Sequence, residues 1–293
     1  MTTVVDSVGS VGDTAIAVRA QALGKRYRSK WALRECTFDL PEGRVAALVG
    51  ANGAGKTTLM TVLAGLLDAD EGSAGAAGRV AFVSQEKPVY RHFSAADMLR
   101  LGAHLNVVWD ETRARRWLAR FEIPLDKACG KLSGGMQAQV AFALAIGSRP
   151  SVLMLDEPLA NLDPLARREV TAELLSEVAE TGMTVLLSTH VVAELAGVAD
   201  YLLLLAHGRL LAGGDLDDLL ARHVGYTGPR SDVPPVRGTV VDARHNDTQS
   251  SFVVELAEGQ PRHVVGGQWS QRSLTLEEYV LAQLEATRKG TGA

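Results

Sequence analysis

The chain has 293 residues, of which 46% are hydrophobic and 22% are charged, and its formal net charge is −4. This length and composition predict a folded protein with one large domain or two unequal ones. Because Lys and Arg number 30 against 34 Asp and Glu, no overall positive field would attract nucleic acid, and we expect no nucleic-acid partner. The two cysteines, Cys36 and Cys129, are too few for a disulfide framework, and we expect two buried thiols.

Targeting and membrane-spanning signals are weak. Residues 1–14 carry no basic residue before their valines, which argues against a signal peptide, and we expect a flexible N-terminus there. The strongest apolar runs are far shorter than the about 20 residues that a membrane-spanning helix needs. If the protein works at a membrane, a protein partner must hold it there.

The first predicted elements are two exposed antiparallel strands, because Ile16–Leu23 and Leu33–Leu40 alternate imperfectly between apolar and polar residues. Short apolar runs follow, separated by helical segments. They indicate buried parallel strands of an α/β layer fold. These runs are Val45–Val49, Val152–Leu155, Val185–Leu187 and Tyr201–Ala206.

The pattern changes to helix between about residues 93 and 148. Three helices are expected there, each behind a capping residue: Ala95–His104 behind Ser94, Glu111–Phe121 behind Asp110, and Gly134–Ile146 behind Ser133. We therefore predict an α-helical subdomain inserted into the α/β core.

The main domain is predicted to span residues 15–222. Proline and glycine in 223–238 indicate a linker. Residues 239–293 are predicted to form a small α+β accessory domain, whose role the sequence leaves open. It would hold a hairpin over Thr239–Ala243 and Ser251–Leu256, and a last helix that begins at the capping box Thr275–Glu278 and ends at Ala286.

The segment Gly50–Thr57 reads GANGAGKT and fits the phosphate-loop pattern G-x-x-x-x-G-K-[ST]. Glycines let backbone N–H groups turn toward a triphosphate without side-chain clashes. Lys56 adds a positive charge at the β- and γ-phosphates, and Thr57 offers a hydroxyl to Mg²⁺. The following helix, roughly Thr57–Leu63, presents its positive end. We expect ATP to contact Gly50, Asn52, Gly53, Ala54, Gly55, Lys56, Thr57 and Thr58.

A second motif ends the apolar run Val152–Leu155 with two carboxylates, Asp156 and Glu157. An aspartate at a strand end beside a phosphate loop can hold Mg²⁺, directly or through water. The next carboxylate can orient or deprotonate the attacking water. The pair predicts ATP hydrolysis, with Asp156 on the metal and Glu157 as a catalytic residue.

The third motif, Lys131–Gln137, reads KLSGGMQ, and Ser133 with the N–H groups of two glycines at a helix start would form an anion site. It resembles the LSGGQ signature of the ATP-binding subunits of ABC transporters, and the resemblance covers about Ala17–Leu219. It implies a P-loop NTPase core with an antiparallel β subdomain and an inserted helical subdomain. Met136 stands where the family usually has Gln. Because Ser133, Gly134 and Gly135 are intact, we expect altered packing or signalling rather than a dead site.

The resemblance implies roles for three further residues. Gln85 matches the family glutamine that touches Mg²⁺ and water. His190 matches the switch histidine that contacts the γ-phosphate and helps hold the catalytic geometry. Tyr27 matches the aromatic residue that stacks on adenine.

The resemblance also implies a dimer of cassettes, identical or different. In the family, the signature of one chain, here Ser133–Met136, closes on the ATP held by the opposite chain. Asn161, Leu162 and Asp163 match the loop that crosses the dimer interface, and Ala160 replaces a common Ser before it.

A separate transmembrane permease subunit is implied as well, which would place the chain at the cytoplasmic face of the cell membrane. Residues 105–131 resemble bacterial exporters of the ABC-2 type, so the resemblance favours export of a substrate that the sequence does not name.

Two other functions stay open. A soluble ABC ATPase acting on ribosomes or nucleic acid would share these motifs, although ribosomal types usually fuse two cassettes and DNA-repair types carry a long coiled coil. A regulatory module that holds ATP without turnover would not need Glu157 and His190.

Overall fold

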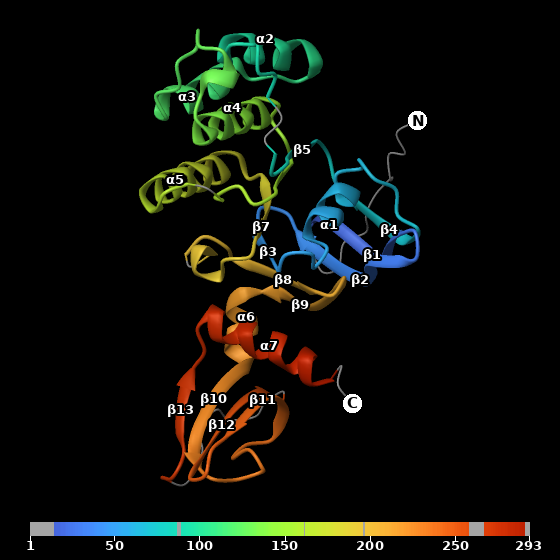
Figure 1. Cartoon of the computed structure of the whole chain (residues 1–293), viewed down its shortest axis with the longest axis vertical. Coiled ribbons are helices and arrows are strands. Elements are labelled where there is room, and N and C mark those ends of the chain that lie inside the picture. The colour runs from blue at the N-terminus through green and yellow to red at the C-terminus, as the bar shows by residue number, and fades with distance from the viewer. Residues whose placement is uncertain (1–14, 87–88, 161, 196, 258–266, 291–293) are drawn as a thin grey trace. The chain divides into compact units, whose positions relative to one another are not determined.

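The computed structural model describes residues 15–86, 89–160, 162–195, 197–257 and 267–290 (Figure 1). The predicted flexible N-terminus, residues 1–14, lies outside these ranges. The chain divides into two compact units, one up to residue 190 together with 205–210, the other 191–204 together with 211 onward. The domain boundary placed at residue 222 stays a prediction.

Three antiparallel strands form the first sheet, in the order β2-β1-β4: β1 (Ile16–Tyr27), β2 (Lys30–Pro41) and β4 (Glu71–Ala76). The pairing runs from Ile16 opposite Pro41 to Tyr27 opposite Lys30. Both predicted strands are confirmed, and both are longer than expected. The prediction that they are exposed is wrong for β1, most of whose residues are buried. Strand β4 was not predicted, because its residues, EGSAGA, include none of the β-branched or aromatic types that favour strands.

A six-stranded sheet has the order β5-β6-β7-β3-β8-β9. Its strands are β3 (Val45–Val49), β5 (Val80–Val83), β6 (Val152–Leu155), β7 (Thr184–Thr189), β8 (Tyr201–Ala206) and β9 (Arg209–Asp215). The neighbours from β5 to β3 run parallel, and every residue of β3, β6 and β7 is buried, which explains the continuous apolar runs. Because the strands are parallel, their carboxyl ends meet at one edge of the sheet.

The helical subdomain consists of α2 (Ala95–Leu105), α3 (Glu111–Arg120) and α4 (Gly134–Gly147), which pack together (Figure 1). Ser94, Asp110 and Ser133 cap these helices as predicted. Trp117 lies fully buried among them, stacks on Phe142 at 5.5 Å between ring centroids, and donates its indole N–H to a buried glutamine. A short 3₁₀ turn (Cys129–Lys131) leads into α4. Both cysteines are buried and free, as expected.

The remaining helices of the first unit are α1 (Lys56–Leu63), directly after β3, and α5 (Pro164–Thr181), between β6 and β7. None of the helices in the described part of the chain is both long enough and apolar enough to cross a bilayer.

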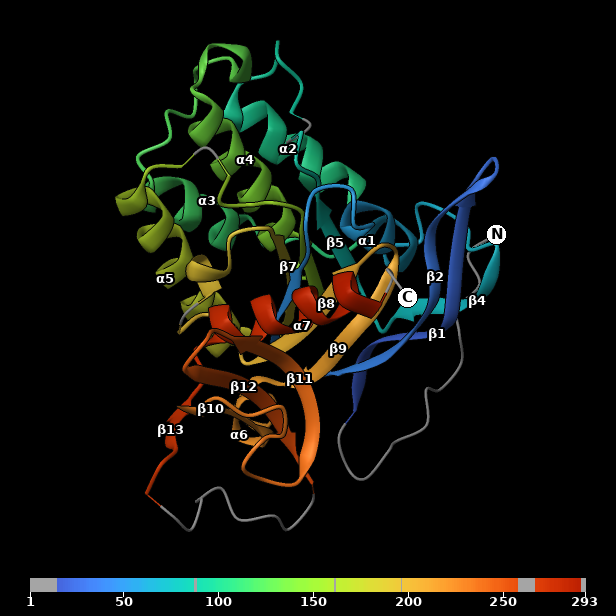
Figure 2. The same cartoon turned by 60° about the horizontal axis from the view of Figure 1, so that its bottom comes forward.

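The second unit contains a four-stranded antiparallel sheet, in the order β11-β12-β10-β13, and the helix α7 (Leu276–Gly290) (Figure 2). Its strands are β10 (His223–Pro229), β11 (Gly238–His245), β12 (Gln249–Leu256) and β13 (Ser270–Ser273). A 3₁₀ turn (Val192–Leu195) and α6 (Leu216–Arg222) precede them. The predicted hairpin is confirmed as β11–β12, and Thr275 and Glu278 exchange the two hydrogen bonds of the predicted capping box.

The predicted linker over 223–238 is wrong for its first seven residues, which form β10. This strand lies inside the sheet between β12 and β13, where Val224 and Tyr226 are buried against Phe252 and Val254. The Gly-Pro composition misled the sequence analysis. A side chain at Gly228 would come within 2.4 Å of Trp269, and Pro229, which lacks an N–H donor, comes last in the strand.

A network of ion pairs joins α3 to α5. Glu177 on α5 is 1% exposed, and its carboxylate accepts hydrogen bonds from Arg113, at 2.7 Å, and from Arg116. Arg116 also donates to the more exposed Glu180 at 2.9 Å. Hydrogen bonds to these two carboxylates raise the pKa of Arg116. Because Glu177 is almost fully buried, the two arginines offset the desolvation cost of its carboxylate.

Glu177→Gln should therefore lower the free energy of unfolding by about 1–3 kcal/mol, because an NH2 donor would face one of the guanidinium groups and the negative charge between the two arginines would be lost. Glu180→Gln is the matched control on the same helix, and its cost should stay below about 1 kcal/mol because water screens this pair. Urea denaturation of both variants measures the difference. Equal losses would show that the buried carboxylate adds nothing to the network.

Candidate functional site

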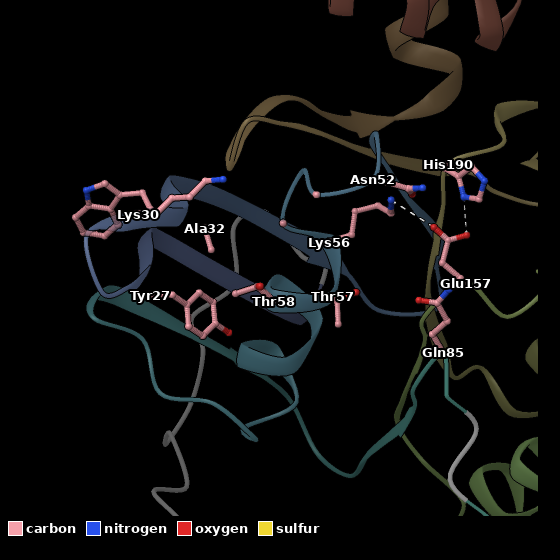
Figure 3. A pocket seen from close by; sticks show the side chains of 13 residues that line it. Tyr27, Lys30, Ala32, Asn52, Lys56, Thr57, Thr58, Gln85, Glu157 and His190 are labelled. Carbon is pink, nitrogen blue, oxygen red and sulfur yellow. Dashed lines mark hydrogen bonds and ion pairs between the residues drawn. The ribbon is translucent and has the colours of Figure 1, made fainter.

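Most of the residues predicted to bind ATP line one cavity of about 520 Å³ (Figure 3). The residues around this cavity come from β1, β2, the loop and helix after β3, and the segments that follow β5, β6 and β7. The lining residues are Tyr27, Lys30, Trp31, Ala32, Asn52, Gly53, Gly55, Lys56, Thr57, Thr58, Gln85, Glu157 and His190.

The phosphate loop joins the end of β3 to the start of α1. Gly55 has φ +110°, and a side chain there would come within 2.7 Å of the Ala32 carbonyl oxygen, so only glycine fits. Lys56 is 6% exposed, and its ammonium donates to the Gly50 carbonyl at 2.7 Å. Gly50 thus holds the lysine without lining the cavity, and Ala54 is buried in the loop.

Asp156 is 2% exposed, and each of its oxygens accepts a hydrogen bond from a hydroxyl. Thr57 donates to Oδ2 at 2.7 Å, and Ser188 donates to Oδ1 at 2.6 Å. Thr57 and the Gln85 amide both line the cavity, and the Thr57 hydroxyl connects Asp156 to it. One carboxylate with neutral oxygen donors beside a phosphate loop suits Mg²⁺, which completes its coordination with phosphate oxygens and water.

Glu157 lies between two nitrogen groups, as the dashed lines in Figure 3 show. Its Oε1 is 3.3 Å from the Lys56 ammonium, and its Oε2 is 2.9 Å from Nδ1 of His190. Glu157 is 8% exposed, and its backbone is left-handed, with φ +49°. The carboxylate is thus held at one place in the cavity, where it can accept a proton from a water molecule.

Tyr27 lies across the cavity from Glu157, where its ring is half exposed at the end of β1 (Figure 3). Lys30, Trp31 and Ala32 of the neighbouring strand line the same region, and the sequence analysis missed all three. Arg26 covers the Trp31 ring, with its guanidinium carbon 5.3 Å from the ring centre. The predicted antiparallel pairing of these two strands could have indicated the three residues, because the turn between the strands places the start of the second strand beside Tyr27.

The signature residues Ser133–Met136 do not line this cavity. They start α4, where Ser133 and Gly134 are exposed and the Ser133 hydroxyl accepts the Met136 N–H at 3.2 Å. The structure therefore does not bring the signature and the phosphate loop of one chain into a common site.

The predicted interface loop lies next to the signature. A side chain at Gly135 would come within 3.3 Å of the buried Leu162. Asp163 caps α5 by accepting the N–H groups of Leu165 and Ala166 at 3.0 Å each. Asn161 lies outside the described residues.

Ser188 is a site residue that the sequence analysis missed. In the parallel pairing of β6 and β7, Leu155 lies opposite Leu187, so the next residues, Asp156 and Ser188, are neighbours. The available signal was a polar residue near the end of an apolar strand. A serine two residues before a candidate histidine does not by itself indicate a function.

Comparison with protein families agrees with this site. The family model described as ABC transporter matches residues 33–160. A second model, described as AAA domain, putative AbiEii toxin, Type IV TA system, matches residues 128–196, which exclude the phosphate loop.

Individual relatives align over a longer part of the chain than the family models do. The aliphatic sulfonates import ATP-binding protein SsuB 2 of Xanthomonas axonopodis pv. citri is 35% identical over 212 residues, which are 69% of this chain and 72% of the relative. The Nod factor export ATP-binding protein I of Sinorhizobium fredii is 31% identical over 227 residues, 72% of this chain and 66% of the relative.

A solved structure described as the ATP binding subunit of an ABC transporter superposes with a TM-score of 0.65 and 27% identity. The superposition covers 70% of this chain and 92% of that structure. The fold is that of a P-loop NTPase with mixed sheets and helices, as predicted. From the cavity, the motifs around it and these relatives it follows that the chain belongs to the ABC transporter family, as an ATP-binding cassette that hydrolyses ATP.

Proposed function

We propose that this cassette drives transport as one half of a cassette dimer, attached through a separate transmembrane subunit to the cytoplasmic face of the membrane. The observation that carries the proposal is that Lys56, Thr57 and Glu157 line one cavity, while Asp156 is hydrogen-bonded to Thr57 beside it. These groups would bind phosphate, bind the metal and act as a general base. A module that only binds ATP, without hydrolysing it, would not need the general base Glu157.

Each side chain has a defined part in the proposed chemistry. The loop N–H groups and Lys56 bind the phosphates, while Thr57, Gln85 and Asp156 hold Mg²⁺, which neutralises phosphate charge when bound. An incoming triphosphate offers Lys56 a more highly charged partner than Glu157. The released carboxylate then accepts a proton from the attacking water, and His190 keeps it oriented.

A second cassette is proposed because the residues expected to bind an anion, Ser133–Met136, do not line the cavity of their own phosphate loop. The serine and first glycine of this segment are exposed at the start of α4, where N–H groups and the helix dipole favour a phosphate. A partner chain that places its ATP there would complete two shared sites.

The names of the relatives favour transport over action on ribosomes or nucleic acid. Names that specify import and export occur at similar identity, 35% and 31%, so they give no support to the expected export direction. The net charge of −4 agrees with a partner other than nucleic acid.

Glu157→Gln tests the proposed chemistry. The variant should bind ATP, hydrolyse it about 10²–10⁴-fold more slowly and accumulate as a closed dimer, because the amide cannot take the proton of water. Phosphate release and gel filtration with ATP measure the two effects. Glu122→Gln is the matched control, because this exposed glutamate also has a left-handed backbone, with φ +51°. Normal turnover in Glu157→Gln would refute its role.

Tyr27→Ala tests adenine stacking. Loss of the ring should weaken ATP binding by about 1–3 kcal/mol and leave the binding of inorganic triphosphate unchanged. Calorimetric titration of both ligands measures the difference. Trp31→Ala is the comparison variant, because Arg26 covers the ring of this second aromatic residue. If Tyr27→Ala weakens both ligands equally, the tyrosine does not bind the base.

Ser133→Arg tests the shared site. The bulky arginine side chain should prevent the partner chain's ATP from binding at the signature. The phosphate loop of the mutant chain should still bind nucleotide. Dimerisation and hydrolysis should therefore both fail. A mixture with Lys56→Ala should then regain part of the ATPase activity, because one of the two sites combines an intact loop with an intact signature. Hydrolysis at the normal rate by monomeric Ser133→Arg would exclude the dimer mechanism.

A further inference from the structure

A fully buried hydroxyl joins the carboxylate of Asp156 to the backbone of Glu157. Ser188 is 0% exposed and is the second-last residue of β7. Its Oγ donates to Oδ1 of Asp156 at 2.6 Å and accepts the backbone N–H of Glu157 at 2.9 Å. One side chain is therefore bonded both to the proposed metal ligand and to the residue that carries the proposed base.

The bond to Asp156 determines how that carboxylate is oriented. With Oδ1 engaged by Ser188, Oδ2 points to the Thr57 hydroxyl at 2.7 Å, on the side of the phosphate loop. A carboxylate can rotate about its terminal bond with little resistance, because such torsions have broad energy minima. A hydrogen bond from a buried hydroxyl restricts that rotation, as outer partners of metal ligands commonly do.

The hydrogen bond between Ser188 and the Glu157 N–H stabilises an unfavourable backbone conformation of Glu157. With φ +49°, Glu157 lies in the left-handed region, which residues with a Cβ atom rarely occupy. Such a conformation persists only where the surroundings enforce it. The hydrogen bond from its N–H to Ser188 fixes the peptide plane between Asp156 and Glu157, and this plane sets the direction in which the Glu157 side chain leaves the strand.

We propose that Ser188 is a positioning residue for ATP hydrolysis. Its hydroxyl aims Asp156 at the metal position and holds Glu157 where its carboxylate meets Lys56 and His190. This inference rests on the roles proposed above for Asp156 and Glu157. Ser188 itself does not line the cavity and so would touch neither nucleotide nor water.

Ser188→Ala removes both hydrogen bonds with the loss of one atom. We expect kcat to fall about 10- to 100-fold while the dissociation constant for metal-free ATP changes less than about twofold, because the phosphate loop is untouched. Mn²⁺ serves as the metal probe. Its affinity for the ATP-bound protein, titrated by electron paramagnetic resonance, should fall about tenfold. Loss of stability alone would lower the amount of folded protein without changing the Mn²⁺ affinity of the folded fraction.

Thr184→Val is the matched control on the same strand. Thr184 is 1% exposed, and its hydroxyl accepts the Gly43 N–H at 2.9 Å, at the opposite end of β7. This variant should keep both kcat and Mn²⁺ affinity even if its thermal unfolding temperature falls. Ser188→Thr retains the hydroxyl and should recover most of both quantities. If Ser188→Ala does not fold, Ser188→Cys, a weaker donor of similar shape, should show an intermediate loss of Mn²⁺ affinity.

Glu157→Gln, measured in parallel, separates the inference from the function on which it rests. If Glu157→Gln is inactive but the Ser188 variants match Thr184→Val in kcat and Mn²⁺ affinity, the positioning role is overturned and the proposed function stands. If Glu157→Gln hydrolyses ATP at the normal rate, the proposed chemistry fails and the inference fails with it.

Discussion

The buried carboxylate of Asp156 is the constraint on which the site depends. A charge that is 2% exposed is costly unless hydrogen bonds compensate it, and both of its oxygens accept hydroxyl groups. The donors come from two other elements, Thr57 from α1 and Ser188 from β7. Three segments distant in sequence are therefore joined at one point. This arrangement also determines where Lys56 and His190 lie, because Lys56 precedes Thr57 and His190 is two residues after Ser188.

The same arrangement brings two opposite charges together. Lys56 and Glu157 are both largely buried, and their charged groups are 3.3 Å apart. Each therefore offsets the desolvation of the other. In the proposed chemistry, a triphosphate would replace Glu157 as the partner of Lys56, and ATP binding would thereby free the carboxylate.

Both units bury apolar side chains. In the first, the parallel sheet and its helices bury the apolar runs, and the ion pairs of Glu177 hold α3 of the helical subdomain to α5, the helix that Asp163 caps. In the second, Val224, Tyr226, Phe252 and Val254 form a small core of their own. The nucleotide cavity is lined only by residues of the first unit, so its chemistry is explained without the C-terminal sheet.

The amino-acid sequence by itself determined the phosphate loop, the two carboxylates after β6 and the signature, because each is a local pattern whose chemistry depends on neighbouring residues. It also determined the long capped helices and the buried strands, because their periodicity is local. The tertiary structure alone decided that Ser188 joins Asp156 to Glu157, that Lys30–Ala32 face the same cavity as Tyr27, and that His223–Pro229 form a strand inside a sheet. These features arise from contacts between segments that are not adjacent in the sequence. Such contacts produce no local pattern of residue types from which they could be predicted.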